Sequence, residues 1–401
     1  MIQRIAQWLN LDLLLSLEAR EKRRLMIGAG ALLFCLLWGL IFGLAQFFYS
    51  YLMAYVFWLG VSLGCLAVLM LHHLVGGSWG AMIQRILEAG TRTLPLLAVL
   101  LVPILLGMGF LYEWSLLSVV AKDEVLQYKR WYLNIPFFLI RAVIFFAVWL
   151  TIAHYLNHWS QRHEETAGQP IQATYRYRIQ TLSAGGLVAY GLTMSFASFD
   201  WVMSLNPHWY STLYGMLFIA SQALSAFAFA IIVVSRLADV APLRTVLTTQ
   251  RIHDLGNMLF AFIMIWAYLS FSQFLIIWSG NTAEAVPWYV HRSQGGWQWI
   301  ALVLFLVHFA LPFVLLLMRM MKRNLSALTC VATVLFIAHV LDQFWLVLPE
   351  LHPSRLTIHV MDILAPIGMG FIWVTLYIKL LHQRSLIPLE DRRLQEVSDH
   401  E

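Results

Sequence analysis

Several runs of apolar residues in this sequence are interrupted by single side chains that can carry a proton or a charge. His308 and His339 lie near the middles of two such runs, and Asp342 follows His339 by three positions. That spacing places His339 and Asp342 on one face of a helix. Asp200 and Arg141 lie nearer the ends of two other runs. An ionisable group in lipid hydrocarbon costs roughly 2.5–3.5 kcal/mol on insertion scales, so these side chains are expected to face a protein interior or a wet cavity.

Ionisable residues occur at every depth of the apolar runs. Carboxylates lie in one half, two histidines at the middle, and histidines with a further carboxylate at the other end. Proton transfer needs groups whose pKa can approach 7, which histidine meets directly and a buried carboxylate can meet. The predicted proton-path residues are Glu113, Arg141, Asp200, His253, Asp254, His308, His339, Asp342 and His72. In the alternative interpretation each group pairs locally, as Arg141 would with Asp200 or Glu113, and only fixes helix packing.

The chain is expected to bind no redox cofactor of its own. Cys35, Cys65 and Cys330 lie far apart within apolar runs, and the sequence contains neither C-x-x-C nor C-x-x-C-H. Ligand sets for zinc, an iron–sulfur cluster or covalent haem are therefore not predicted. His308 and His339 share a depth on adjacent antiparallel runs, so a b-type haem held between them is a second hypothesis.

Membrane-spanning helices must position these residues. The chain is 60% apolar and 12% charged, whereas soluble domains are about half apolar and a quarter charged. Runs of about 20 apolar residues predict an all-α protein with ten transmembrane helices. The predicted spans are 25–49, 51–74, 94–114, 135–156, 179–203, 212–234, 255–279, 298–318, 326–348 and 361–381.

The distribution of lysine and arginine tests this count of spans. Twenty of these residues lie on one side, five lie on the other, and Arg141 lies within a span. The positive-inside rule then places both termini in the cytoplasm. The basic residues form no patch, so nucleic acid is not an expected partner.

Three regions follow from the same pattern. Residues 1–24 form a cytoplasmic segment, in which the apolar residues of 1–17 have the spacing of a short interfacial helix. The N-terminal run is too long for a cleaved signal peptide. Residues 25–382 form the ten-helix domain, and 383–401 form a cytoplasmic tail.

Aromatic residues are concentrated in the predicted periplasmic connections. An aromatic belt accounts for rings at helix ends, but it accounts less well for the tight connection 204–211. A docking surface for a partner is the alternative. Its candidate residues are Asn206, His208, Trp209, Trp288 and Tyr289.

A weak internal repeat is also visible. Trp114-Ser115 ends the third span and Trp131-Tyr132 precedes the fourth, while Trp278-Ser279 ends the seventh and Trp288-Tyr289 precedes the eighth. Spans 2–5 and 6–9 could therefore be parallel repeats.

Several longer segments are similar to one family. They are His72-His-Leu-Val-Gly-Gly-Ser-Trp-Gly80, 130–138 with Arg141, 198–215, His253-Asp-Leu-Gly-Asn257, 266–281 and 288–297. Together they resemble the second quinone-binding-type membrane subunit of alternative complex III, the bacterial quinol:cytochrome c oxidoreductase. That subunit belongs to the NrfD-like, polysulfide-reductase membrane-subunit family. The resemblance runs from about residue 25 to 382.

The resemblance implies two four-helix bundles plus two further helices in a bacterial inner-membrane, multi-pass subunit. It implies a quinol-oxidising electron-transfer complex whose partners include a sister ten-helix NrfD-like subunit and periplasmic subunits that carry iron–sulfur clusters and haem c. This chain would be a non-catalytic, proton-conducting companion. Asp200, Arg141, Asp254 and His253 lie within the family motifs, and Asn206 stands where the family more often has an acidic residue.

Two other functions remain open at this stage. One is a proton- or ion-coupled secondary transporter, for which broken helices at matching positions of two repeats would be expected. Pro103 and Pro312 interrupt spans 3 and 8, which are not matching positions. The other is a membrane anchor that itself oxidises quinol, in which case quinone would bind this chain.

Overall fold

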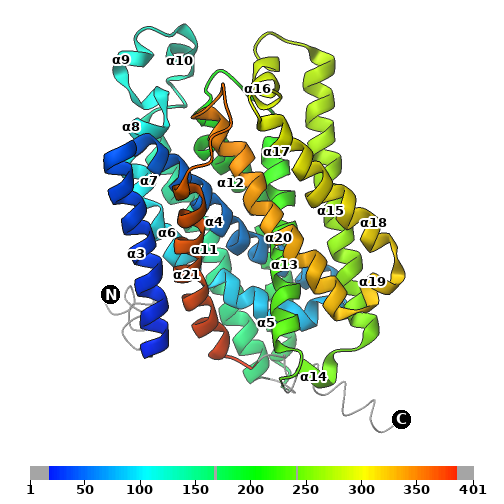
Figure 1. The fold of residues 1–401 in the computed structure, drawn as a ribbon. Coiled ribbons are helices and arrows are strands. Elements are labelled where there is room, and N and C mark those ends of the chain that lie inside the picture. The colour runs from blue at the N-terminus through cyan, green and yellow to red at the C-terminus, as the bar shows by residue number, and fades with distance from the viewer. Residues whose placement is uncertain (1–17, 167–168, 241–242, 386–401) are drawn as a thin grey trace, which may run out of the picture.

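The computed structural model describes residues 18–166, 169–240 and 243–385, and over these residues the chain is helical with no strand. Ten helical segments are long and apolar enough to cross a membrane, which confirms the predicted all-α, multi-pass membrane fold. The predicted interfacial helix within 1–17 and the tail from 386 onward lie outside the described residues. Both ends of the described chain lie at the lower end of the bundle in Figure 1. That end is called the terminal face below, and the opposite end, with α9, α10 and α16, is called the loop face.

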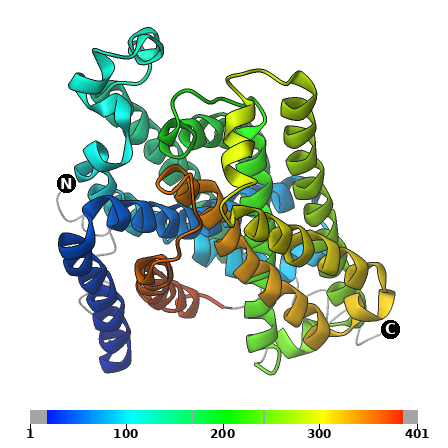
Figure 2. The same ribbon diagram turned by 45° about the horizontal axis from the view of Figure 1, so that its top comes forward.

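The helices group as the two predicted bundles and a pair. The first bundle holds α4 (Leu44–Val75), the broken segment α5 (Ser78–Thr91), α6 (Leu94–Leu100), α7 (Val102–Leu106) and α8 (Met108–Leu111), then α11 (Ile135–Glu165) and α12 (Gln172–Trp201). The second holds α13 (Tyr214–Leu237), α15 (Thr249–Gly280), the segment α17 (Trp297–Leu304), η3 (Phe305–Ala310) and α18 (Leu311–Leu317), and α20 (Leu325–Val347). The first and last spanning helices, α3 (Ala19–Phe42) and α21 (Val360–His382), pack on each other and on α4, as Figure 2 shows at the edge of the molecule.

Short helices complete the connections. At the loop face these are η1 (Glu113–Ser115), α9 (Leu117–Val120), α10 (Glu124–Lys129), η2 (Met203–Leu205), α16 (Val286–Arg292) and η4 (Leu348–Glu350). At the terminal face they are α14 (Leu243–Val246) and α19 (Arg319–Arg323).

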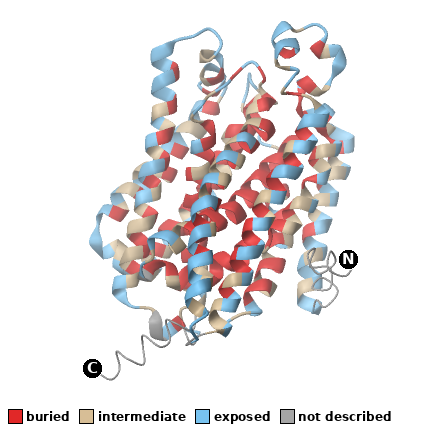
Figure 3. Ribbon diagram, turned by 180° about the vertical axis from the view of Figure 1, so that it is seen from behind, coloured by how far each residue is buried: buried red, intermediate tan, exposed pale blue. Residues whose placement is uncertain are grey.

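Helix α4 forms the centre of the molecule. Every residue from Gln46 to Met70 is buried, which is expected of a helix that is apolar on all sides. Helix α13 packs along it, and Figure 3 shows the buried residues concentrated in this interior. A Cβ atom on Gly64 would overlap the backbone carbonyl oxygen of Gln222. The small residue therefore permits the close approach that its G-x-x-x-G spacing predicted.

Two predicted boundaries were wrong. The first two spans were divided at residue 50, but α3 ends at Phe42 and Gly43 turns the chain with a φ of 132°. Only glycine adopts that backbone conformation readily. The apolar run continues through the turn, so hydropathy cannot locate it.

The second wrong boundary concerns residues 75–93, which were assigned to a cytoplasmic connection. Most of them form α5 (Ser78–Thr91), whose Arg85 and Glu88 are 2% and 1% exposed. The third span consequently begins near Trp79. Arg85 was counted among the cytoplasmic charges, but it lies inside the protein and is paired there.

Candidate functional site

A buried polar cluster lies where α13 and α20 meet. The hydroxyl of Ser221 lies 3.0 Å from Nδ1 of His339 and donates to Oδ2 of Asp342 at 3.0 Å. His339 Nδ1 and Asp342 Oδ2 are 3.7 Å apart. The three residues are no more than 5% exposed. The predicted shared face of His339 and Asp342 is confirmed, and the partner that joins them, Ser221, was not predicted.

His308 lies beside this cluster. Its ring centroid is 6.3 Å from that of His339 and 4.3 Å from that of Trp266. It belongs to the π-helical turn η3, and such single turns within α-helices are frequent at functional sites. Both ring nitrogens of His308 and Nε2 of His339 are buried with no hydrogen-bond partner among the described residues. Unpaired buried polar atoms are rare and require an explanation.

The cluster is continued towards α12 by a second pair. The Tyr190 hydroxyl donates to Oε1 of Gln222 at 2.6 Å, and Gln222 follows Ser221 on α13. A Cβ atom on Gly60 would lie 3.3 Å from Cγ of Gln222 and 3.8 Å from Nε2 of His339. Gly60 therefore lies between these two polar side chains. Neither Tyr190 nor Gln222 was predicted, because an isolated tyrosine or glutamine within a span has no distinctive sequence signal.

Near the loop face, Arg141 and Asp200 form a two-point ion pair. Arg141 donates from Nε to Oδ2 of Asp200 at 2.7 Å and from Nη2 to Oδ1 at 3.0 Å. Its Nη1 donates to the Tyr132 carbonyl at 2.9 Å, and its guanidinium lies 3.9 Å from the Tyr132 ring centre. Asp200 is fully buried. Arg141 thus pairs with Asp200, as the alternative interpretation of the sequence expected, and the pair stabilises the contact between α11 and α12.

An equivalent pair occurs in the second bundle. Arg292 donates to Glu350 at 2.9 Å and lies 3.6 Å from the Trp288 ring centre. Each arginine lies near the loop-face start of the third span of its bundle, and each carboxylate lies near the loop-face end of the fourth. This repeated arrangement supports the predicted repeat of spans 2–5 and 6–9.

A third group of charges is buried near the terminal face. Glu88 accepts from Ser160 at 2.6 Å and from Nη1 of Arg384 at 3.0 Å, and it also pairs with Arg85. Arg85 pairs in turn with Glu164 at the end of α11. Since a buried carboxylate is tolerated only when paired and hydrogen-bonded, these partners account for Glu88 inside the bundle. The i, i+3 spacing of Arg85 and Glu88 was the available signal, and it was missed.

A fourth network joins α4 to α21 near the loop face. Asp362 accepts from Gln46 at 2.9 Å, from the hydroxyl of Ser50 at 2.6 Å and from the backbone N–H of His359 at 2.8 Å. Oε1 of Gln46 lies 2.7 Å from Nε2 of His352. Burial lowers the pKa of His352, and the Asp362 charge partly opposes that effect.

The remaining predicted proton-path residues lie away from these clusters. Glu113 is exposed in η1. His72 is near the terminal-face end of α4, where its ring packs against Trp79 with centroids 5.4 Å apart. His253 contacts Asn257, and Asp254 accepts from Gln250, at the start of α15.

The predicted docking residues fall into two groups. Trp209 and Trp288 are each 3% exposed, and their rings stack 4.5 Å apart within this chain. Internal packing explains them, so they are not surface anchors. Asn206 and Tyr289 are partly buried. His208 is exposed and lies 2.8 Å from Asp123, the N-cap of α10.

The contact between His208 and Asp123 ties the 203–213 connection to the α9–α10 excursion. Backbone N–H donation from Leu126 lowers the pKa of Asp123, and His208 lowers it further. Lys129 donates to the Pro207 carbonyl at 2.5 Å, which adds a second tie. The two connections therefore form one continuous surface at the loop face.

The b-haem hypothesis has steric consequences. The ring of Trp266 packs against His308, and the ring of Phe57 lies 5.4 Å from that of His339. A porphyrin held between the two imidazoles would have to displace these rings. Among the described residues, no three histidine, cysteine or carboxylate side chains gather as a metal site would require.

No protein-family model and no curated protein matches this sequence.

Proposed function

We propose that this protein is a cofactor-free membrane subunit of a quinol-oxidising electron-transfer complex and that its buried polar residues conduct protons. The sequence resemblance supports the complex, since it implies partners that carry the haem c and iron–sulfur groups. The observation that carries the proton proposal is the Ser221–His339–Asp342 cluster with His308 beside it, whose ring nitrogens have no hydrogen-bond partner in the described part of the chain. The excess of basic residues in the sequence supports a cytoplasmic position for the terminal face, and the resemblance supports a bacterial inner membrane.

The cluster has the chemistry that proton transfer needs. A serine hydroxyl can donate one hydrogen bond while it accepts another. When Asp342 is protonated, Ser221 can accept its proton and pass its own to Nδ1 of His339, so that the hydroxyl is restored. Imidazole can then release a proton from Nε2, which faces the interior near Gly60 and Gln222. His308 lies next to His339 as the adjacent titratable group.

Two other groups of buried charges lie on opposite sides of the Ser221–His339–Asp342 cluster. The Arg141–Asp200 pair lies on the loop-face side and the Glu88 group on the terminal-face side. Both groups are held by ion pairs, so we expect them to stay charged and to hold the helices together. The central cluster is then the part that exchanges protons. This assignment narrows the path to Ser221, His308, His339 and Asp342.

The test is proton release by the reconstituted complex. We expect Ser221→Ala, Asp342→Asn and His339→Gln to keep normal assembly and quinol:cytochrome c turnover while reducing quinol-driven acidification. Ser225→Ala is the matched control, because Ser225 is buried one turn further along α13 and donates only to the Gln222 carbonyl. Equal acidification by the Ser221 and Ser225 variants would remove the cluster from the path. Loss of folded protein in the cluster variants alone would assign it to helix packing.

Purification in mild detergent tests membership of the complex. Subunits that contain haem c should co-purify with this chain. A lone, colourless protein that catalyses ion exchange in vesicles would support the transporter instead. Quinol oxidation by this chain after removal of the sister subunit would support the quinol-oxidising anchor.

The loop face is the proposed docking surface for the periplasmic subunits. Tyr210 and Trp131 are 61% and 74% exposed there, and aromatic anchors commonly cost at least about 2 kcal/mol when removed from an interface. Replacing both with serine should reduce co-purification of the periplasmic subunits without changing the yield of this chain. Trp278→Ser, on the exposed end of α15 at 68% exposure, is the control for a belt residue.

A further inference from the structure

A pocket opens beside the terminal-face end of α11, separate from the central cluster. It has a volume of about 310 Å³ and lies between the start of α6, the α11 helix and the residues that follow α21. Arg92, Arg384 and His158 contribute polar walls, while Pro95 and Leu150 contribute apolar ones. It is called the basic pocket below.

Positive charges outnumber negative charges around the basic pocket. Glu88 is shared between Arg85 and Arg384, and Glu164 is paired with Arg85. Among the described residues, the hydrogen-bond partners of Arg92 are uncharged: they are the Leu380 carbonyl at 3.3 Å and the side chain of Gln383. Three guanidinium groups thus face two carboxylates in this part of the described chain.

The position of the basic pocket also limits which ligand can fit it. Helix α6 begins with Leu94 and Pro95 and continues as a spanning segment, so apolar walls lead from the guanidinium groups into the membrane. A ligand that fits needs a negatively charged head and an apolar tail. Basic pockets between spanning helices bind the headgroups of anionic phospholipids in this way.

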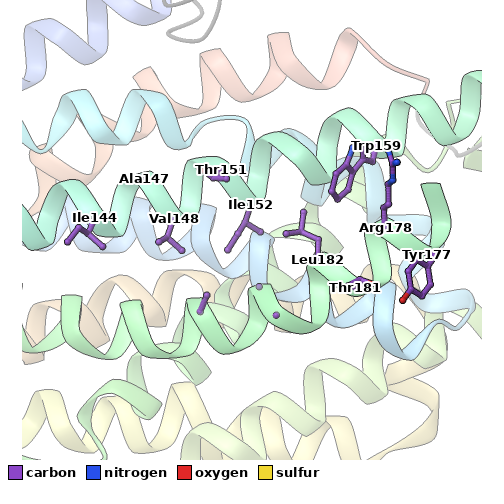
Figure 4. A pocket seen from close by; sticks show the side chains of 13 residues that line it. Ile144, Ala147, Val148, Thr151, Ile152, Trp159, Tyr177, Arg178, Thr181 and Leu182 are labelled. Atoms are coloured by element: carbon purple, nitrogen blue, oxygen red, sulfur yellow. The ribbon is translucent and has the colours of Figure 1, made fainter. Parts of the chain in front are cut away.

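A neighbouring groove lacks this combination. It has a volume of about 730 Å³ and lies between α11 and α12, with walls that are almost entirely apolar, including Ile144, Val148 and Leu182. Arg178 contributes a cationic side chain to this groove and lies at one end of it beside Trp159, as Figure 4 shows. Arg178 is exposed to solvent, whereas Arg92 is partly buried and held in position by two hydrogen bonds.

We propose that the basic pocket is a site for one anionic phospholipid of the surrounding membrane. The lipid phosphate accepts hydrogen bonds from Arg92 and Arg384, and one acyl chain runs along Pro95 and Leu150. The single negative charge of phosphatidylglycerol balances the excess guanidinium. Charge-assisted hydrogen bonds of arginine to phosphate are among the stronger polar contacts available to a protein.

The experiment uses the full chain, delipidated in detergent, with lipid binding followed by native mass spectrometry and by the melting temperature. Added phosphatidylglycerol should bind and raise the melting temperature more than added phosphatidylcholine does. Arg92→Gln should weaken phosphatidylglycerol binding by about tenfold or more, as expected for the loss of one hydrogen bond between charged groups. Arg178→Gln, the same change at the neighbouring groove, should leave it unchanged.

A second variant keeps the proposal testable if Arg92→Gln fails to fold. His158 lines the pocket and is exposed, so His158→Glu should fold, yet its carboxylate should repel the lipid. His158→Gln should still bind it. Equal binding of the two lipids, unchanged phosphatidylglycerol binding by His158→Glu, or an equal rise in melting temperature with inorganic phosphate would each overturn the proposal.

Discussion

The Arg141–Asp200 pair allows the strongest quantitative prediction about stability. Arg141→Gln leaves the Asp200 carboxylate without its cation in a position where Asp200 is fully buried. Asp200→Asn leaves the Arg141 guanidinium without its anion, but the Arg141 side chain is 14% exposed. The Arg141 guanidinium left by Asp200→Asn can therefore be hydrated more easily than the Asp200 carboxylate left by Arg141→Gln. We expect Arg141→Gln to be the more destabilising change.

Geometry sets the size of the effect. Two hydrogen bonds of 2.7 and 3.0 Å join the charged groups. Unit charges about 4 Å apart attract by about 4 kcal/mol at an effective dielectric constant of about 20. Breaking a buried pair by removing one partner costs roughly 3–5 kcal/mol. We therefore expect Arg141→Gln to cost about that much and Asp200→Asn to cost less.

The double variant decides whether pairing is the cause. With both charges neutralised, no buried charge is left unpaired, so the loss should be smaller than the sum of the two single losses by about 2 kcal/mol or more. Folded protein would be followed by tryptophan fluorescence and size-exclusion chromatography during detergent denaturation. Arg162→Gln is the control, because the Arg162–Glu165 pair is about half exposed and should contribute at most about 1 kcal/mol. Single losses that simply add would refute the reasoning.

Four further predictions follow from the packing and from the sequence motifs. Gly64→Leu should destabilise the protein by about 1–3 kcal/mol or prevent folding, because α4 and α13 would clash; Gly185→Leu, which faces open space, should not change the melting temperature. Arg292→Gln should reduce the yield of folded protein more than Arg292→Lys does, with both measured by size-exclusion chromatography. The isolated chain should show no Soret absorbance and no bound iron, and a Soret band would restore the b-haem hypothesis. Because burial lowers the pKa of His352, the unfolded state takes up its proton first, so stability should fall as the pH drops through about 6.5; the melting temperature of His352→Gln should lose this dependence.

The sequence by itself determined the class of protein and the number of spans. Lipid requires about 20 apolar residues in each crossing helix, and this requirement is local, so it can be read from consecutive residues. The pairing of His339 with Asp342 on one face was also local, since three positions make nearly one turn of helix. The resemblance supplied the two-bundle arrangement, which the contacts between helices agree with.

Only the tertiary structure decided which polar residues meet. Ser221 joins His339 and Asp342 from 118 and 121 positions away, and Arg384 reaches Glu88 across 296 positions. Trp209 and Trp288 could be read as surface anchors from the sequence, yet they stack inside the protein. Helix periodicity specifies which face a residue occupies, but it does not specify which other helix covers that face. That choice depends on the packing of all ten spans at once, and so on long-range contacts that no short stretch of sequence contains.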